Sequence, residues 1–500
     1  MMSAHSPALL ILFPLLASFV IAAVVWLDRR LCYPVAVIGL AGAVYSAGHL
    51  FVQVLQSGTI TYRFGGWPPP MGIELQVDQL NILVLGIIPL VALINMVASK
   101  RSMHAELGIK DETFYIVYLL FVTGILGVTA TADLFNLYVL IEISSLASYG
   151  MLAMGPQERA PWASLNYVFL GVIGASFYLL GVGYLYIMTG SLNMGDVHSL
   201  LPPIMYSPAI VVAFVFCLIG VWIKMALFPL HGWLPNAYSY APVSATRVIA
   251  PLMTKVMIYV MIRIMLTVFG YEYVFEDLNL QKWVVVLASV AILAGAFLAL
   301  AQQDLKKMLA YIIVCEVGYM VGGAWLGNMN GMTGAVLHII NDALMTFALF
   351  LVLGNIVYVH KKTSFENLSG LFSSMPWTMA GFVLAGVSII GVPPTCGFFS
   401  KWYLILGGIE AGSWLFVAAL VLSSLISAVL VFRIVEIGFF PAGDEEHGEH
   451  AHGQEVVKEA PVSMLGSLGV VGMGLIAVGI WSGFFVQRFI VPFVQQGMMQ

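Results

Sequence analysis

The chain has 500 residues, of which 61% are hydrophobic and only 9% are charged, and its mean hydropathy is +0.97. Soluble domains carry about one quarter charged residues because a surface that faces water must be solvated, so most of this surface must face hydrocarbon. The net charge of -5 argues against a nucleic-acid partner, since nucleic acid requires a concentrated basic surface. The composition therefore predicts a polytopic protein in a lipid bilayer.

The cysteines are far apart in the sequence and fall in or beside apolar segments: Cys32, Cys217, Cys315 and Cys396. Their spacing does not fit a metal site, so we expect small buried side chains. The sequence also has no iron–sulfur cysteine cluster, no haem motif and no Gly-x-Gly-x-x-Gly loop. We therefore expect no cofactor and no redox centre in this chain.

Apolar runs of about 20 residues, the length that crosses a membrane, recur along the whole sequence. The first run lacks a basic segment before it and is long enough to span, so it predicts a helix rather than a cleavable signal peptide. The pattern predicts an all-α fold with about 14 transmembrane helices, centred near residues 18, 42, 89, 121, 142, 175, 217, 256, 292, 317, 345, 388, 425 and 476.

Basic residues gather in alternate loops, beginning with Arg29 and Arg30 after the first helix. By the positive-inside rule, this bias places both termini outside the cell. Residues 57–78 contain a strand-like run and a Gly/Pro cluster, and they predict a short outward hairpin. Residues 443–459 predict an acidic, His-rich inward loop; we expect it to be solvated rather than to bind metal, because no fixed geometry holds its histidines.

Charged residues inside spanning helices cost about 2.5–3.5 kcal/mol each on insertion, so each needs a function or a partner. A lysine near a helix end could instead extend to the interface, an alternative that suits Lys401 best. For Glu142, Lys224 and Lys255 the alternative to a functional role is structural pairing. The candidates, with one neighbouring histidine, are Glu142, Lys224, Lys255, Glu316, Asp342, Lys401 and His338. Acids and bases together allow proton transfer along a row without a free ion entering hydrocarbon.

Two of the apolar runs are interrupted by proline and glycine, just after Lys224 and just before Lys401. Irregular backbone at membrane depth is tolerated only where it lines protein or a wet cavity. Paired breaks indicate two inverted five-helix repeats around a transport site. The expected organisation is an N-terminal segment (1–111), a first repeat (112–270), a second repeat (281–440), the His-rich loop (441–462) and a C-terminal helix (463–500).

Three segments then carry a family resemblance: residues 134–142, 224–238 and 301–311. They resemble the antiporter-like subunits shared by Mrp-type cation/proton antiporters and respiratory complex I, and the match runs in order over nearly the whole chain. Residues 253–259, together with Arg263, are most similar to the D-type subunit of Mrp antiporters.

The resemblance implies a 14-helix fold with two half-channels. In the first, Glu142 would pair with Lys224; Lys255 would relay protons centrally, and Lys401 would control the second half-channel. His338 matches a family histidine.

The chain departs from the family pattern after His338, where a second histidine and a lysine are replaced by Asp342 and Thr346. Asp342 lies four residues after His338, so both project from one helix face. Two alternatives follow: Asp342 anchors His338 by a hydrogen bond, or Asp342 and Glu316 replace the missing groups as proton carriers.

The function implied by the resemblance is proton translocation in a larger membrane assembly that exchanges Na⁺, or a similar cation, for H⁺ in a bacterial or archaeal cell membrane. Its expected partners are other membrane subunits, the lipid bilayer, H⁺ and Na⁺. One alternative is a pumping subunit of a complex I-like NADH:quinone oxidoreductase or a membrane-bound hydrogenase. Another is a stand-alone transporter of small solutes. Whether the chain is an enzyme stays open, since translocase activity would belong to the complex.

Overall fold

The computed structural model describes residues 5–440 and 459–499, and almost all of them are helical. Thirteen helices in this part of the chain are long and apolar enough to cross a membrane, which confirms the all-α polytopic fold. The remaining predicted crossing is divided into α15 (Pro376–Ile390) and α16 (Cys396–Glu410), of 15 residues each. Each half is about 22 Å long and too short to span alone, so the two form one interrupted crossing.

The N-terminal segment contains three long helices and a hairpin. Strands β1 and β2 pair antiparallel with Ile60 opposite Val77, and an Arg63–Glu74 ion pair of 3.1 Å lies at the turn end. The predicted hairpin is therefore present. The elements are α1 (Ser6–Val24), α2 (Cys32–Ser57), β1 (Ile60–Arg63), β2 (Glu74–Val77) and α3 (Asn81–Leu107).

Two series of helices follow, and each has a break in its fourth long helix. The first comprises α4 (Asp111–Ala130), α5 (Leu134–Ala153), α6 (Ala160–Thr189), α7 (Met194–Leu200), α8 (Pro208–Met225), α9 (Leu234–Tyr240) and α10 (Val243–Arg263). The second comprises α11 (Gln281–Leu300), α12 (Leu305–Trp325), α13 (Met329–His360), α14 (Leu371–Ser374), α15, α16 and α17 (Trp414–Phe439). The break lies between α8 and α9 in the first series and between α15 and α16 in the second.

The C-terminal segment, expected as one helix, is divided into α18 (Val462–Ile480), α19 (Ser482–Phe485) and α20 (Val491–Met499), with a π-helical turn between the last two. The start of α1 and the end of α20 lie at the same end of the bundle as the hairpin. His5 contacts Tyr62 of β1, and Phe493 shares a cavity with Thr59. An even number of crossings is consistent with this arrangement. Residues 441–458, which make up most of the predicted His-rich loop (441–462), lie outside the described residues.

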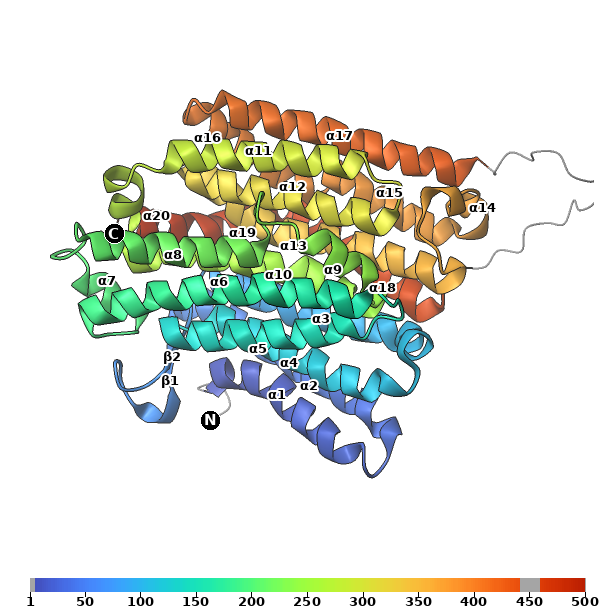
Figure 1. Cartoon of the computed structure of the whole chain (residues 1–500), viewed down its shortest axis with the longest axis horizontal. Helices are drawn as coiled ribbons and strands as arrows, with labels where there is room; N and C mark the ends of the chain where they lie inside the picture. The colour runs from blue at the N-terminus through green and yellow to red at the C-terminus, as the bar shows by residue number, and fades with distance from the viewer. Residues whose placement is uncertain (1–4, 441–458, 500) are drawn as a thin grey trace, which may run out of the picture.

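Helices α10, α12 and α13 form the centre of the bundle, and the other helices surround them (Figure 1). Every residue of α10 from Val243 to Arg263 is buried. A helix in this position exchanges contact with lipid for contact with protein, so it can carry ionisable side chains that a lipid-facing helix cannot. The central position of these three helices therefore decides where charge is tolerated.

Glycines allow α6 and α8 to pack backbone against backbone, as small residues do in membrane proteins. A Cβ on Gly181 would lie 2.8 Å from the carbonyl oxygen of Ala213 and 2.9 Å from the amide of Cys217, both on α8. A Cβ on Gly220 would lie 2.6 Å from the carbonyl oxygen of Gly174. This close contact holds α8, and with it Lys224, against α6.

We predict that Gly181→Ala lowers the thermal stability of the detergent-solubilised chain by about 1–3 kcal/mol, because the new methyl group overpacks a contact between two backbones. Gly183→Ala is the matched control on the same helix, since its Cβ would meet nothing within 4 Å. Thermal unfolding followed by circular dichroism compares the two. Equal stability of both variants would contradict the close α6–α8 contact.

Candidate functional site

The first cluster of buried charges joins α5 to the end of α8. Lys224 Nζ lies 3.0 Å from Glu142 Oε1, and it also donates to Ser145 Oγ at 2.8 Å and to the Tyr149 hydroxyl at 3.5 Å. The Lys224 side chain is 2% exposed, whereas that of Glu142 is 21% exposed. The pair expected from the sequence is therefore formed, and its acid is the more accessible partner.

Lys224 is positioned by the break that follows it. Helix α8 ends at Met225, and Ala226 adopts left-handed backbone angles (φ 60°), which are costly for a residue with a Cβ. The carbonyl of Ile223 accepts a hydrogen bond from Trp233 Nε1 at 3.1 Å, so the broken end is satisfied inside the protein. An ammonium in the last turn of a helix is stabilised by the negative end of the helix dipole.

The second cluster joins the centres of α10 and α13. Lys255 Nζ forms an ion pair with Asp342 Oδ2 at 2.8 Å, and both side chains are almost completely buried. Thr346 donates its hydroxyl to Asp342 Oδ1 at 2.7 Å, one helical turn along α13. Lys255 Nζ lies 3.4 Å from both Thr346 Oγ1 and the carbonyl oxygen of Ala250. The central lysine is therefore held by an acid and not left alone.

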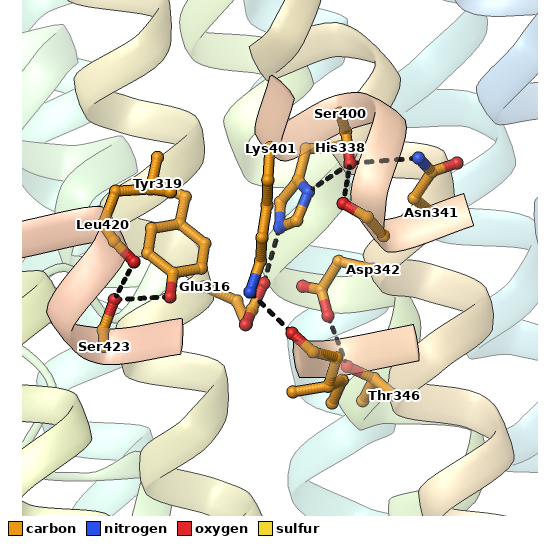
Figure 2. Close-up of polar contacts among 12 residues, drawn as sticks. Glu316, Tyr319, His338, Asn341, Asp342, Thr346, Ser400, Lys401, Leu420 and Ser423 are labelled. Carbon is orange, nitrogen blue, oxygen red and sulfur yellow. Dashed lines mark hydrogen bonds and ion pairs between the residues drawn. The ribbon is translucent and has the colours of Figure 1, made fainter. Parts of the chain in front are cut away.

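The third cluster is built around His338, as Figure 2 shows. Its Nε2 lies 2.5 Å from Glu316 Oε2 of α12, and its Nδ1 lies 2.8 Å from Ser400 Oγ of α16. Ser400 also accepts a hydrogen bond from Asn341 Nδ2 at 3.0 Å and lies 3.3 Å from the carbonyl oxygen of Gly397. Asp342 therefore does not anchor His338, which was the first of its two alternatives. Glu316 and Ser400 make the hydrogen bonds to the imidazole instead.

Lys401 reaches back from α16 to the broken end of α15. Its Nζ donates to the carbonyl oxygen of Ile389 at 2.6 Å and to Ser424 Oγ at 3.2 Å, and it lies 4.9 Å from the centre of the Tyr319 ring. The side chain is 4% exposed, so it does not extend to the interface as the alternative from the sequence would require. A cavity of about 180 Å³ adjoins it.

The structure thus gathers the seven candidates into three acid–base pairs and one lysine held by neutral oxygens. Within residues 5–440 and 459–499, no ion pair joins one cluster to another. The Tyr319 ring contacts both His338 and Lys401: its centroid lies 5.6 Å from that of the His338 ring, at an interplanar angle of 71°, and 4.9 Å from Lys401 Nζ (Figure 2).

The sequence interpretation missed several residues. Ser145 and Tyr149 follow Glu142 by three and seven positions, and Tyr319 follows Glu316 by three, so helical spacing could have indicated all three. Asp78 and Arg263 form a buried ion pair towards the hairpin end. Arg247 is completely buried, and Lys306 is buried in the first turn of α12. These charges lie near helix ends, where a charge is ordinarily solvated, so the sequence did not indicate that they are buried.

A central bundle with buried acid–base pairs and two broken helices defines a class of membrane proteins that move ions through protein-lined polar paths. The family model described as "NADH:quinone oxidoreductase/Mrp antiporter, TM" matches residues 131–427, which include all seven candidates. The chain belongs to this family.

Similar proteins carry two kinds of name. The chain is 41% identical to NADH-quinone oxidoreductase subunit N of Desulforudis audaxviator, with 98% of each chain covered. It is 31% identical to the putative antiporter subunit mnhD2 of Staphylococcus haemolyticus, with 79% of this chain and 78% of the relative covered. Among solved structures, a chain of the membrane-bound sulfane sulfur reductase, an archaeal respiratory membrane complex, is 28% identical with a TM-score of 0.88, covering 99% of this chain and 98% of that one.

We predict that Asp342→Asn and Lys255→Met are each destabilising by about 3–5 kcal/mol, since each leaves one charge buried without its partner. The double variant should lose clearly less than the sum of the two, because it removes both charges together. Thermal unfolding of the four proteins measures the coupling. Additive losses would show that the 2.8 Å ion pair contributes no coupling energy.

Proposed function

We propose that this chain is the proton-translocating membrane subunit of a multisubunit complex. The observation that carries the proposal is the set of three buried acid–base pairs, each formed between two different helices. A pair of this kind holds one exchangeable proton without placing a net charge in hydrocarbon. A proton that arrives at one pair also alters the next through weakly screened Coulomb forces.

In the first half-channel, Glu142 is the loading group because it is the more exposed member of its pair. Its protonation removes the negative charge that holds the Lys224 ammonium. Lys224 then favours release of its own proton toward Lys255, with Ser145 and Tyr149 available as hydroxyl relays. Lys255 first passes its own proton on; the proton that it then receives from Lys224 is held against Asp342, and Thr346 orients that carboxylate.

In the second half-channel, Glu316 and His338 take the proton that leaves the central pair. Either group can hold it, because the carboxylate and the imidazole nitrogen lie in one short hydrogen bond. Lys401 is the last carrier and lies at the cavity beside Ser424. Asp342 and Glu316 thereby act in place of the histidine and lysine of the family pattern, each at a different pair.

The first candidate for the whole complex is exchange of Na⁺, or a similar monovalent cation, for H⁺. The similarity to a putative antiporter protein and the resemblance of residues 253–259 to the D-type Mrp subunit support it. The second candidate is a redox-driven pump, which the 41% identical quinone oxidoreductase relative favours. In that case partner subunits would carry the redox centres. Both candidates assign the same proton carriers to this chain.

The finer topology belongs to the same proposal. Both termini face outward in a bacterial or archaeal cell membrane, and α4–α10 and α11–α17 are the two inverted repeats. The basic loops support the orientation, and the corresponding breaks after α8 and α15 support the repeats.

The two candidates separate in proteoliposomes that contain the complete complex. An outward Na⁺ gradient should drive proton uptake without any reductant if the complex is an antiporter. A redox-driven pump should instead acidify one side only when an electron donor and acceptor are added, and a Na⁺ gradient alone should move no protons.

We predict that Glu142→Gln, in the same vesicles, lowers proton transport at least about a hundredfold, because loss of a general acid–base group typically costs 10²–10⁴ in rate. The matched control is Glu410→Gln, which removes an exposed carboxylate that accepts a hydrogen bond from Asn330 at the periphery. Normal transport by the Glu142 variant, at normal assembly, would remove this pair from the pathway.

We predict that Lys255→Arg is strongly impaired although the positive charge is kept, since a guanidinium stays protonated at any working pH whereas an amine can release its proton. The transport rate of the assembled complex, measured against Lys255→Met, provides the comparison. If the arginine variant is fully active and the methionine variant is inactive, the site needs a fixed charge and Lys255 is not a proton carrier.

A further inference from the structure

A cavity of about 300 Å³ lies at the end of the bundle opposite the hairpin, between the two helix series. Its walls come from the end of α3, the start of α10, the start of α12 and the end of α13, and they include Ser102, Glu106, Val243, Lys306 and Lys361. The cavity lies above the start of α10, the helix that carries Lys255. The central Lys255–Asp342 pair lies further along the same helix.

Arg247 lies one turn below Val243 on α10 and is completely buried. Its Nη1 donates to the hydroxyls of Ser99 and Ser102, each at 3.5 Å, and its Nε donates to the carbonyl oxygen of Phe350 at 3.3 Å. Among the described residues, no carboxylate lies within 4 Å of the guanidinium. The group is therefore a positive charge whose hydrogen-bond partners are neutral oxygens, and the Glu106 carboxylate attracts it from beyond 4 Å.

Glu106 is the acid near this charge, but its hydrogen bonds are made with other groups. Its Oε2 accepts hydrogen bonds from the Val243 amide at 3.0 Å and from the Ser244 hydroxyl at 3.3 Å, so it caps the start of α10. The buried Lys306 and the lysine at position 361 also line the cavity. Cations thus outnumber carboxylates around this space and immediately below it.

Helix α13 is shaped to accommodate the guanidinium. A Cβ on Gly354 would lie 1.7 Å from Arg247 Nη2, so the planar group fits only where this helix has no side chain. The guanidinium lies between Gly354 of α13 and the hydroxyls of Ser99 and Ser102 on α3. A buried guanidinium without a carboxylate in direct contact is costly, and such charges in membranes are retained for function.

Lys255 follows Arg247 by eight residues, which is about 12 Å along the axis of α10. Arg247 thus lies between the cavity and the central Lys255–Asp342 pair. A cation moving from the cavity towards that pair would have to pass a fixed charge of its own sign in a region of low dielectric. Arginine side chains exclude protons and cations from water-conducting pores by this same effect.

We propose that Arg247 is a charge barrier that excludes protons and monovalent cations of the cavity from the Lys255–Asp342 pair. The central pair then exchanges protons only with the neighbouring pairs, and the cavity does not short-circuit the pathway. This inference rests on the proposed function, because a barrier has a role only if Lys255 carries protons. It assigns the cavity to water and anions and not to the transported cation.

The test measures passive proton leak in proteoliposomes that contain the complete complex, with an imposed pH difference and neither a coupling-cation gradient nor a reductant. Arg247→Met removes the charge and keeps much of the length, and it should increase the leak about tenfold or more, because the repulsion is lost. Arg247→Lys keeps the charge and should be as tight as the unmodified complex.

A tight Arg247→Met complex, or equal leaks in the methionine and lysine variants, would overturn the barrier. If Arg247→Met does not assemble, Arg247→Gln removes the charge but keeps hydrogen-bond donors for Ser99, Ser102 and the Phe350 carbonyl: a raised leak supports the barrier, and an unchanged leak overturns it. The two proposals fail in different ways. Absence of coupled proton transport in the unmodified complex contradicts the proposed function, whereas normal transport with a tight Arg247→Met variant contradicts only the barrier.

Discussion

A charge in the hydrocarbon region must be matched by another group, and this constraint organises the bundle. Each of the three buried acid–base pairs joins two different helices: α5 to α8, α10 to α13, and α12 to α13. The helices that supply most of these groups are also the ones most shielded from lipid. Desolvation makes an unpaired charge more costly than a mispacked methyl group, so the pairs fix which helices occupy the centre. The surrounding helices then provide the apolar surface that faces the membrane.

The two broken crossings have the same form but different chemistry. Each ends a half-helix whose last carbonyl oxygens lack their usual helical partners, and in hydrocarbon such oxygens need donors. In the first break the Ile223 carbonyl accepts from the Ala226 amide and the Trp233 indole, so Lys224 remains available to its acid. In the second break the donor is Lys401 itself, at 2.6 Å. The second lysine therefore carries out the structural task that a neutral side chain performs in the first.

Composition and apolar periodicity were sufficient to predict the fold class, the two breaks and the buried charges, because long hydrophobic runs make the few charges within them conspicuous. The pairing of Glu142 with Lys224 was implied by the family resemblance. The partners of Asp342 and Glu316 could not be predicted in the same way. Helical spacing places Asp342 one turn from His338. The Asp342 carboxylate nevertheless pairs with Lys255 of α10, and His338 pairs with Glu316 of α12. These choices depend on how separate helices are rotated, which local spacing does not record. Arg247 escaped notice because it lies near a helix end, where a charge is ordinarily solvated.

Ser400 has a single hydroxyl hydrogen and two oxygen or nitrogen atoms that can accept it, His338 Nδ1 at 2.8 Å and the Gly397 carbonyl at 3.3 Å. Asn341 already donates to the same oxygen. When the imidazole is neutral and its other nitrogen donates to Glu316, the hydroxyl must point at Nδ1. When the imidazole is charged, Nδ1 donates instead, and the hydroxyl must rotate to Gly397. A proton that passes through Nδ1 thus leaves this hydroxyl reversed, and the hydroxyl has to rotate back before Nδ1 accepts the next proton. The acceptor to which the Ser400 hydroxyl points therefore depends on whether Nδ1 of His338 carries a proton.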